Sequence, residues 1–275
     1  SGAAAQSDSQ LSFALEGTSD QRLQSGSPAD SISEFLDFLA ALVPQGGVYL
    51  FGGVLRDLAL LGRGGFQSDV DVVVEGPWEP VAAYLESLNA ARNRFGGYRL
   101  QVAGWPVDVW SATNTWAVAE GLVPYNGIAS LLQTTVLNWD AILMNWRSRG
   151  FVCHPWYLAE LRERSLDVVL EENPNPLGMA VRVFRHLSLK DARRISLKAA
   201  SYLARSTQRY SFEVLAAAEL QSYGDQHIEH AIYRLFAEMR FETDKPDQQA
   251  WSAAERSLRA QGVAIAQKQQ ELALG

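Results

Sequence analysis

Val48-Tyr-Leu-Phe-Gly-Gly53 and Ser68-Asp-Val-Asp-Val-Val-Val74 are the two stretches that decide the fold. In the first, a short apolar run ends in two glycines, and the apolar residues between positions 55 and 61 follow at helical spacing. This order predicts a strand, a glycine turn and a helix. In the second, carboxylates alternate with β-branched residues, which predicts a strand with Asp69 and Asp71 on one face.

Two aspartates on one face of a strand predict a metal site. Like charges so close together repel unless a divalent cation lies between them. Mg²⁺ prefers carboxylate and phosphate oxygens, and two such ions can activate an attacking hydroxyl and stabilise a leaving oxygen. Mn²⁺ is the alternative ion. Asp108, in a strand predicted over residues 106–110, places a third carboxylate on adjacent β-structure.

The glycine turn has two readings. Gly52 and Gly53 precede a helix, so their backbone amides can approach a triphosphate while the helix dipole favours its negative charge. Alternatively, the pair forms a tight turn that needs a positive φ. Arg56 and Asp57 also have two readings, as residues lining a nucleotide site or as a local salt bridge.

Composition limits the classes of function. The chain has 275 residues and a formal net charge of −7, which argues against a protein that coats nucleic acid over its whole surface. Cys153 is the only cysteine, so an intramolecular disulfide is impossible and a reducing cytoplasm is indicated. Neither a secretion signal nor a run of about 18 apolar residues is found, so we expect a cytoplasmic protein without a membrane span.

Three segments are predicted along the chain. Residues 1–30 are rich in Ser, Gln, Gly and Ala, which predicts a disordered tail. Residues 31–172 form a strand-rich head that starts with a helix behind Ser31, and residues 173–275 form a helical neck and body. Within the head we expect a helix over 80–95, strands over 98–103, 106–110 and 166–170, a hairpin of 137–146 with 150–154, and a helix over 157–164.

Gly52-Gly53-Val-Leu-Arg56-Asp57, followed by Ser68-Asp-Val-Asp71, resembles the head of the CCA-adding tRNA nucleotidyltransferases and bacterial poly(A) polymerases, in the DNA polymerase β superfamily. Later landmarks extend this resemblance over about residues 46 to 190: Ala141–Asn145, His154-Pro155, Leu158–Leu161, and Pro176-Leu177 with Arg182 and Arg185. It implies an α+β fold, with a small mixed sheet and flanking helices in the head and an all-helical neck and body.

The resemblance also implies a reaction and a site. The reaction is template-independent transfer of NMP from an NTP such as ATP to an acceptor hydroxyl, the acceptor being an RNA 3′ end like that of tRNA, with pyrophosphate release and two Mg²⁺ ions. Asp69 and Asp71 would ligate both ions, and Asp108 would be the third carboxylate, near the attacking hydroxyl. The implied nucleotide-binding residues are Gly52, Gly53, Arg56, Asp57, Ser68, Asp140, Arg182 and Arg185.

The chain departs from this family where the family selects base and acceptor. Thr134-Thr-Val136 replaces an Arg-Arg-Asp run, and Asp140 replaces an Asn. The nucleotide-selecting Glu-Asp-x-x-Arg element is missing at residues 174–178. Two other functions therefore stay open: a nucleotidyltransferase that modifies a protein or small molecule, and a non-catalytic nucleotide-binding relative.

A basic segment is the predicted contact with the acceptor. Between Arg182 and Arg209 lie eight basic residues and one acidic residue. A single helix starting at Ser188 would place Lys190, Arg194, Lys198 and Arg205 on one face, where they would bind RNA or triphosphate. The alternative is a solvated helix face next to acidic neighbours.

Overall fold

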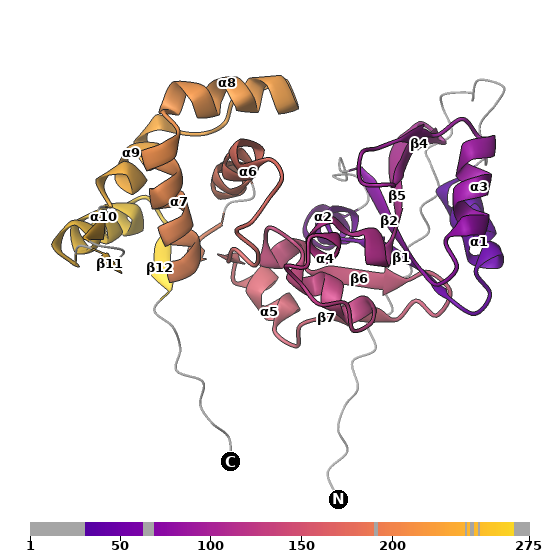
Figure 1. Ribbon diagram of the computed structural model, residues 1–275. Helices are drawn as coiled ribbons and strands as arrows, with labels where there is room; N and C mark the ends of the chain where they lie inside the picture. The colour runs from indigo at the N-terminus through magenta and orange to yellow at the C-terminus, as the bar shows by residue number, and fades with distance from the viewer. Residues whose placement is uncertain are drawn as a thin grey trace, which may run out of the picture.

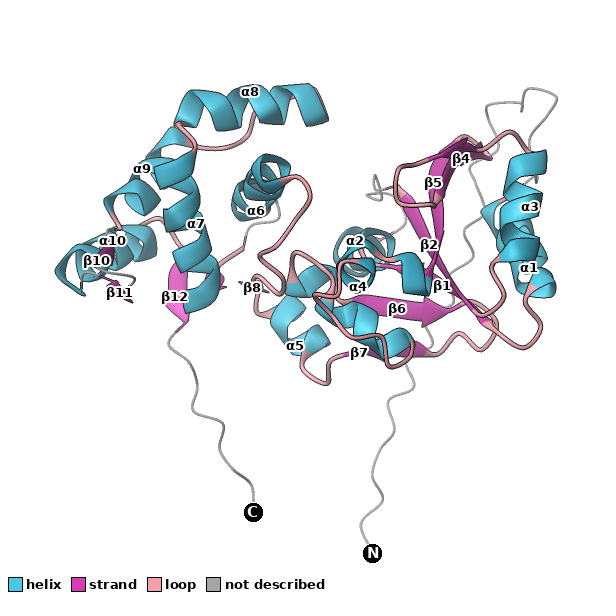
Figure 2. Ribbon diagram, viewed as in Figure 1, coloured by secondary structure: helices cyan, strands magenta, loops and turns pink. Residues whose placement is uncertain are grey.

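The computed structural model describes residues 31–62, 69–189, 192–239, 241–242, 245–246 and 248–266. The head, on the right in Figure 1, holds a long twisted sheet, and the body, on the left, is mainly helical. Figure 2 shows the same division by secondary structure. The predicted tail at 1–30 lies outside the described residues.

Seven strands form the sheet of the head, in the order β3-β4-β5-β2-β1-β6-β7. Every neighbouring pair is antiparallel except β2 and β5, which run parallel. The strands are β1 (Gly47–Phe51), β2 (Val70–Glu75), β3 (Ala91–Arg92), β4 (Tyr98–Val102), β5 (Trp105–Ser111), β6 (Ile142–Asn145) and β7 (Phe151–Cys153).

The two faces of this sheet carry different clusters, because side chains alternate along each strand. Val48 and Leu50 belong to the main core, with helices α1 (Ile32–Leu42), α2 (Gly53–Leu61) and α3 (Glu79–Ser87). Tyr49 and Phe51 face a smaller cluster beneath residues 112–135, which form η2 (Ala112–Asn114), α4 (Trp116–Ala119) and η3 (Ile128–Gln133). Asp71 and Asp108 alternate with core valines, so they point to this second face.

A two-residue turn sets the register of β4 against β5. Ala103 and Gly104 both have positive φ, 51° and 81°, and Val102 pairs with Trp105. Positive φ at both central residues matches the twist of a tight hairpin. The register that follows places Arg99 opposite Asp108.

Five helices form most of the body: α6 (Pro176–Leu189), α7 (Leu197–Arg209), α8 (Phe212–Tyr223), α9 (His230–Glu238) and α10 (Gln248–Ala260). Helix α5 (Tyr157–Arg162) and η4 (Asn138–Asp140) complete the head near the junction. No helix within the described ranges is long and apolar enough to cross a membrane.

The body also contains strands, which the expectation of an all-helical body missed. A three-stranded parallel sheet, in the order β12-β9-β8, joins β8 (Ser165–Leu166) of the head to β9 (Arg194–Ser196) and β12 (Ala264–Ala266). A small hairpin pairs β10 (Phe241–Glu242) with β11 (Lys245–Pro246). Segments of two or three residues are too short to show a strand periodicity in the sequence.

The single basic helix expected from Ser188 onward is wrong. Helix α6 ends at Leu189, β9 follows, and Ser196 begins α7 by accepting a hydrogen bond from the amide of Ala199 at 2.9 Å. The basic residues therefore lie on separate elements. The interruption comes from β9, which pairs with β8 and β12 and buries Ile195 in the core.

Other predicted elements hold with shifted ends. Ser31 caps α1 by accepting from the amide of Glu34 at 3.1 Å, as expected. The helix predicted over 80–95 stops at Ser87, and the strand predicted over 166–170 shortens to β8. The first part of the predicted 137–146 strand is instead η4, so only β6 pairs with β7.

Replacement of Ile195 tests whether β9 joins head and body. Its side chain is fully buried between β8 and β12, so Ile195→Ala should lower the free energy of unfolding by about 3 kcal/mol. Leu197→Ala, at a half-exposed position two residues on, should cost less than about 1 kcal/mol. Urea denaturation followed by circular dichroism measures both, and equal losses would contradict the role of β9.

Candidate active site

A row of charged residues crosses three strands on the second face of the sheet. Asp71 on β2 is the cross-strand partner of Asp108 on β5, and Asp108 is the partner of Arg99 on β4. Asp69 immediately precedes β2. The structure therefore brings the three predicted carboxylates to one end of the sheet, together with an arginine that the sequence analysis had not selected.

The carboxylates carry excess negative charge. Burial raises the pKa of Asp71 to about 7, and the charges of Asp108, Asp69 and Asp140 act in the same direction while Arg182 opposes them. Burial also raises the pKa of Asp108, against the effect of Arg99. The protonated forms of Asp71 and Asp108 are favoured first because the carboxyls lose contact with water, and second because neighbouring carboxylates repel their negative charge.

Arg99 brings positive charge to this row. Its Nη1 donates to Asp108 Oδ2 at 3.0 Å and its Nη2 to Asp69 Oδ2 at 2.6 Å. With the side chains so placed, no three His, Cys, Asp or Glu residues in the described ranges are grouped to hold a metal ion. Three hard carboxylate oxygen donors at a site short of positive charge nevertheless fit Mg²⁺ or Mn²⁺ by their chemistry.

The glycine turn lies at the same end of the sheet. Phe51 pairs with Asp71 in antiparallel register, so the next residues of β1 continue alongside the start of β2. Gly52 has φ 67° and ψ −119°, donates its amide to Ile142 O at 2.9 Å and stands at the start of α2. The positive φ that a tight turn requires is thus present, and α2 begins at the end of the sheet where the carboxylates lie.

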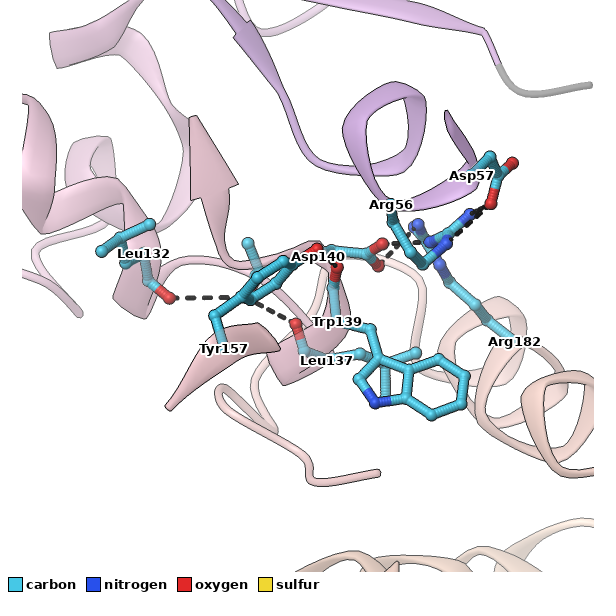
Figure 3. A network of polar contacts seen from close by, with 9 residues as sticks. Arg56, Asp57, Leu132, Leu137, Trp139, Asp140, Tyr157 and Arg182 are labelled. Atoms are coloured by element: carbon cyan, nitrogen blue, oxygen red, sulfur yellow. Dashed lines mark hydrogen bonds and ion pairs between the residues drawn. The ribbon is translucent and has the colours of Figure 1, made fainter. Parts of the chain in front are cut away.

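Arg56, Asp57, Asp140 and Arg182 form one ionic network (Figure 3). Arg56 is 5% exposed, and it donates to Asp57 Oδ1 at 2.9 Å and to Asp140 Oδ1. Arg182 Nη2 donates to Asp140 Oδ2 at 2.8 Å. The network thus connects α2 and η4 of the head with α6 of the body.

Asp140 is the centre of this network. Burial by itself raises the pKa of its carboxyl, but Arg182 and Arg56 outweigh burial and bring the pKa down to about 2. Since Arg182 also lowers the pKa of Asp71, it acts on both the network and the carboxylate row. Arg56 and Asp57 form a local salt bridge, as the alternative reading of these residues had it, but the pair is buried, whereas the side chain of Arg182 is 41% exposed.

The remaining predicted residues are dispersed. Ser68 and Lys190 lie outside the described residues. Arg185 contacts Glu219 at 2.6 Å and Asp225 at 2.7 Å, and so holds α6 against the α8 region. The other three residues of the predicted acceptor face have partners elsewhere in the same chain: Arg194 binds Glu163, Arg205 binds Glu171, and Lys198 donates to the carbonyl of Val169.

A cavity of about 520 Å³ lies between α4, residues 171–176 and α7. Aromatic rings, guanidinium groups and carboxylates line it, from Trp116, Tyr202 and Tyr210, from Arg205 and Arg209, and from Glu120, Glu171 and Glu172. Of the predicted site residues, Arg205 is the one that lines it. The sequence does not show the cavity, because its walls come from three segments that are about 26 to 94 positions apart. The place of Arg99, by contrast, could be predicted from the sequence. The Ala103-Gly104 turn predicts the register of a hairpin, and that register places Arg99 opposite Asp108.

Part of the head is similar in sequence to a known protein family. Residues 32–130 match the family model described as "Nucleotidyltransferase domain". That segment includes the glycine turn, the three aspartates and Arg99. No curated protein matches the sequence.

Three solved structures show the extent of the likeness. A tRNA-processing enzyme complex has a TM-score of 0.51 and 17% identity, over 75% of this chain and 59% of that chain. A CCA-adding enzyme with ATP has a TM-score of 0.50 and 17% identity, over 82% and 56%. A tRNA nucleotidyltransferase with a primer tRNA and an ATP analog has a TM-score of 0.50 and 15% identity, over 74% and 58%.

These comparisons confirm the predicted resemblance and the α+β fold class. At such low identity the structural likeness shows a shared fold. The chain also spans less than two thirds of the length of each of these three proteins.

Replacement of Asp140 tests the ionic network. Its folded-state pKa lies below the unfolded value, so it contributes stability that is complete above pH 4 and is lost as the pH falls toward 2. This contribution is on the order of 2 kcal/mol. Asp140→Asn should also leave buried Arg56 with Asp57 as its remaining carboxylate partner, and cost about 3 kcal/mol at pH 7.

Urea unfolding between pH 2 and 7 measures both effects. Glu255→Gln, which removes a carboxylate from an exposed pair with Arg259 on α10, serves as the control and should change little. Stability of the unmodified protein that stays constant between pH 4 and pH 2 would contradict the role of Asp140.

Replacement of Gly52 tests the turn as a phosphate-binding element. Gly52→Ala forces a side chain into a positive φ region, at about 1–3 kcal/mol, and displaces the first turn of α2. ATP affinity should fall about tenfold, equivalent to about 1.4 kcal/mol. Gly262→Ala, in the body, also places a side chain at a positive φ, 84°, with nothing within 4 Å of the added Cβ, and it should keep the ATP affinity of the unmodified protein. Calorimetric titration compares the two, and equal affinities would contradict the assignment.

Proposed function

We propose that this protein is a metal-dependent nucleotidyltransferase that transfers NMP from an NTP to an acceptor hydroxyl and releases pyrophosphate. The proposal rests chiefly on the convergence of Asp69, Asp71 and Asp108 with the glycine turn at one end of the sheet. The match to the nucleotidyltransferase domain over residues 32–130 supports it. The non-catalytic alternative is less favoured, because a cluster of three acids, of which Arg99 contacts two, costs stability.

Asp69, Asp71 and Asp108 would hold the metal ions. Bound divalent ions would supply charge neutralisation for the phosphates and activation of the acceptor hydroxyl. The N-terminal turn of α2 would bind phosphate through its backbone amides. Arg182, half-exposed and within electrostatic reach of Asp71, would hold negative charge of the substrate beside the carboxylates.

For the acceptor, we propose an RNA 3′ end that reaches the site along the cavity between α4 and α7. Stacking on Trp116, Tyr202 or Tyr210 would hold a base without selecting its sequence. Arg209 would offer positive charge to the phosphates at the cavity wall, where Arg205 is already bound to Glu171. The proteins of similar fold include one solved with a primer tRNA.

A protein or small-molecule acceptor is the second candidate, and the paired basic residues favour it. Arg194 is bound to Glu163 at 3.0 Å and Arg205 to Glu171 at 2.6 Å. Guanidinium groups already paired with carboxylates attract an RNA backbone less strongly than free ones. A smaller acceptor does not need an extended positive surface.

Transfer of labelled NTPs tests the chemistry. Asp71→Asn removes a charge from the centre of the row and should reduce the rate by at least about a thousandfold, because the metal loses a ligand. Asp37→Asn on α1, where the amide oxygen can still accept from Trp146, should keep the rate of the unmodified protein. Equal rates in both variants would overturn the proposed site.

The same assay identifies the acceptor. Each of the four labelled NTPs is incubated with Mg²⁺ and, separately, with tRNA lacking its 3′ end, total RNA, cell protein or small-molecule extract. Label on RNA that is removed by 3′ exonuclease supports the first candidate. Label confined to protein or to small molecules supports the second, and turnover absent with every acceptor would contradict both.

A further inference from the structure

We propose that Arg99 is a positioning residue that occupies the place between Asp69 and Asp108 in the metal-free protein and leaves it when the metal binds. This inference rests on the proposed function, since it assumes that these carboxylates are the metal ligands. Arg99 lies outside the motifs that carried the sequence-based site, and its contacts with both carboxylates mark it as part of the site.

The backbone places Arg99 there by register. Arg99, Asp108 and Asp71 are consecutive cross-strand partners on β4, β5 and β2, so their side chains project from the same face of the sheet. The Ala103-Gly104 turn holds that register. A slip of one residue would turn Arg99 to the opposite face.

The two contacts are of a kind that a cation can displace. The Arg99 side chain is 51% exposed, and those of Asp69 and Asp108 are 42% and 22% exposed. Exposed ion pairs contribute little stability, because water screens them and the long side chain loses entropy. A divalent ion with oxygen ligands binds two carboxylates more strongly than such a guanidinium does.

The position of Arg99 also accounts for the finding that, in the described residues, the three carboxylates are not grouped as metal ligands. Arg99 contacts Oδ2 of Asp69 and Oδ2 of Asp108, the oxygens of two of the three acids. While the guanidinium lies between these two acids, a cation cannot bridge them. Only the fraction of molecules in which Arg99 has left this place can bind the metal, so the apparent metal affinity is reduced in proportion to that fraction.

Replacement of Arg99 should therefore have two opposite effects. Without metal, Arg99→Met leaves Asp69 and Asp108 to repel each other, so the melting temperature in EDTA should fall. With metal, the competitor is gone, so the affinity for Mn²⁺ should rise about three- to tenfold, the range expected for loss of two exposed ion pairs. A purely structural arginine would not raise metal affinity when removed.

Mn²⁺ binding to the full metal-stripped chain, measured by calorimetry and by electron paramagnetic resonance, tests this inference. Arg92→Met is the matched control: it removes the same charge from the neighbouring strand β3, where the guanidinium lies over the Tyr98 ring at 6.0 Å. Its Mn²⁺ affinity should stay within about twofold of the unmodified protein, since distant exposed charges are screened. Arg99→Lys keeps the charge but loses the simultaneous contact with both carboxylates. Its Mn²⁺ affinity should therefore lie between that of the unmodified protein and that of Arg99→Met.

The outcomes separate the inference from the proposed function. If the unmodified protein binds Mn²⁺ through Asp71 but Arg99→Met binds it equally or more weakly, the role of Arg99 is overturned and the proposed function stands. If Arg99→Met and Arg92→Met gain affinity equally, general charge accounts for the effect and the inference fails. If neither the unmodified protein nor Arg99→Met binds Mn²⁺, the metal site and the inference both fail.

Discussion

The parallel pairing of β2 with β5 is the constraint on which the site depends. All other neighbouring strands of the seven-stranded sheet are antiparallel, and this one pair sets Asp71 directly beside Asp108. The valines on either side of each aspartate are buried in the main core, so the aspartates must face the other way. Hydrophobic burial on one face therefore fixes the position of the carboxylates on the other.

Three neighbouring carboxylates repel one another, and the nearby arginines offset their negative charge only in part. Arg182 acts on Asp71 from the body, and Arg99 contacts Asp69 and Asp108 from the neighbouring strand. The pKa of Asp71 is still raised to about 7. A site that remains short of positive charge after its own arginines are counted is suited to bind cations.

The second charge cluster has a different character. Asp140 is buried between Arg56 and Arg182, and its pKa is lowered to about 2 because two guanidinium groups outweigh the effect of burial. This cluster joins the helix after the glycine turn to the first helix of the body. Since Arg182 belongs to this cluster and also acts on Asp71, the junction of head and body is electrostatically coupled to the carboxylate row.

The sequence by itself determined the local pieces: the strand that ends in Gly52, the helix after it, the Asp-x-Asp strand and the presence of Asp108. Local patterns suffice for these because periodicity and glycine turns act over a few residues. Tertiary structure decided which side chains meet. Strand register brought Arg99 to the carboxylates, β9 divided the basic segment, and contacts across more than 80 positions turned Arg56 and Asp57 into an anchor for Asp140. No local pattern carries such information, since pairing between distant segments depends on how the whole core packs.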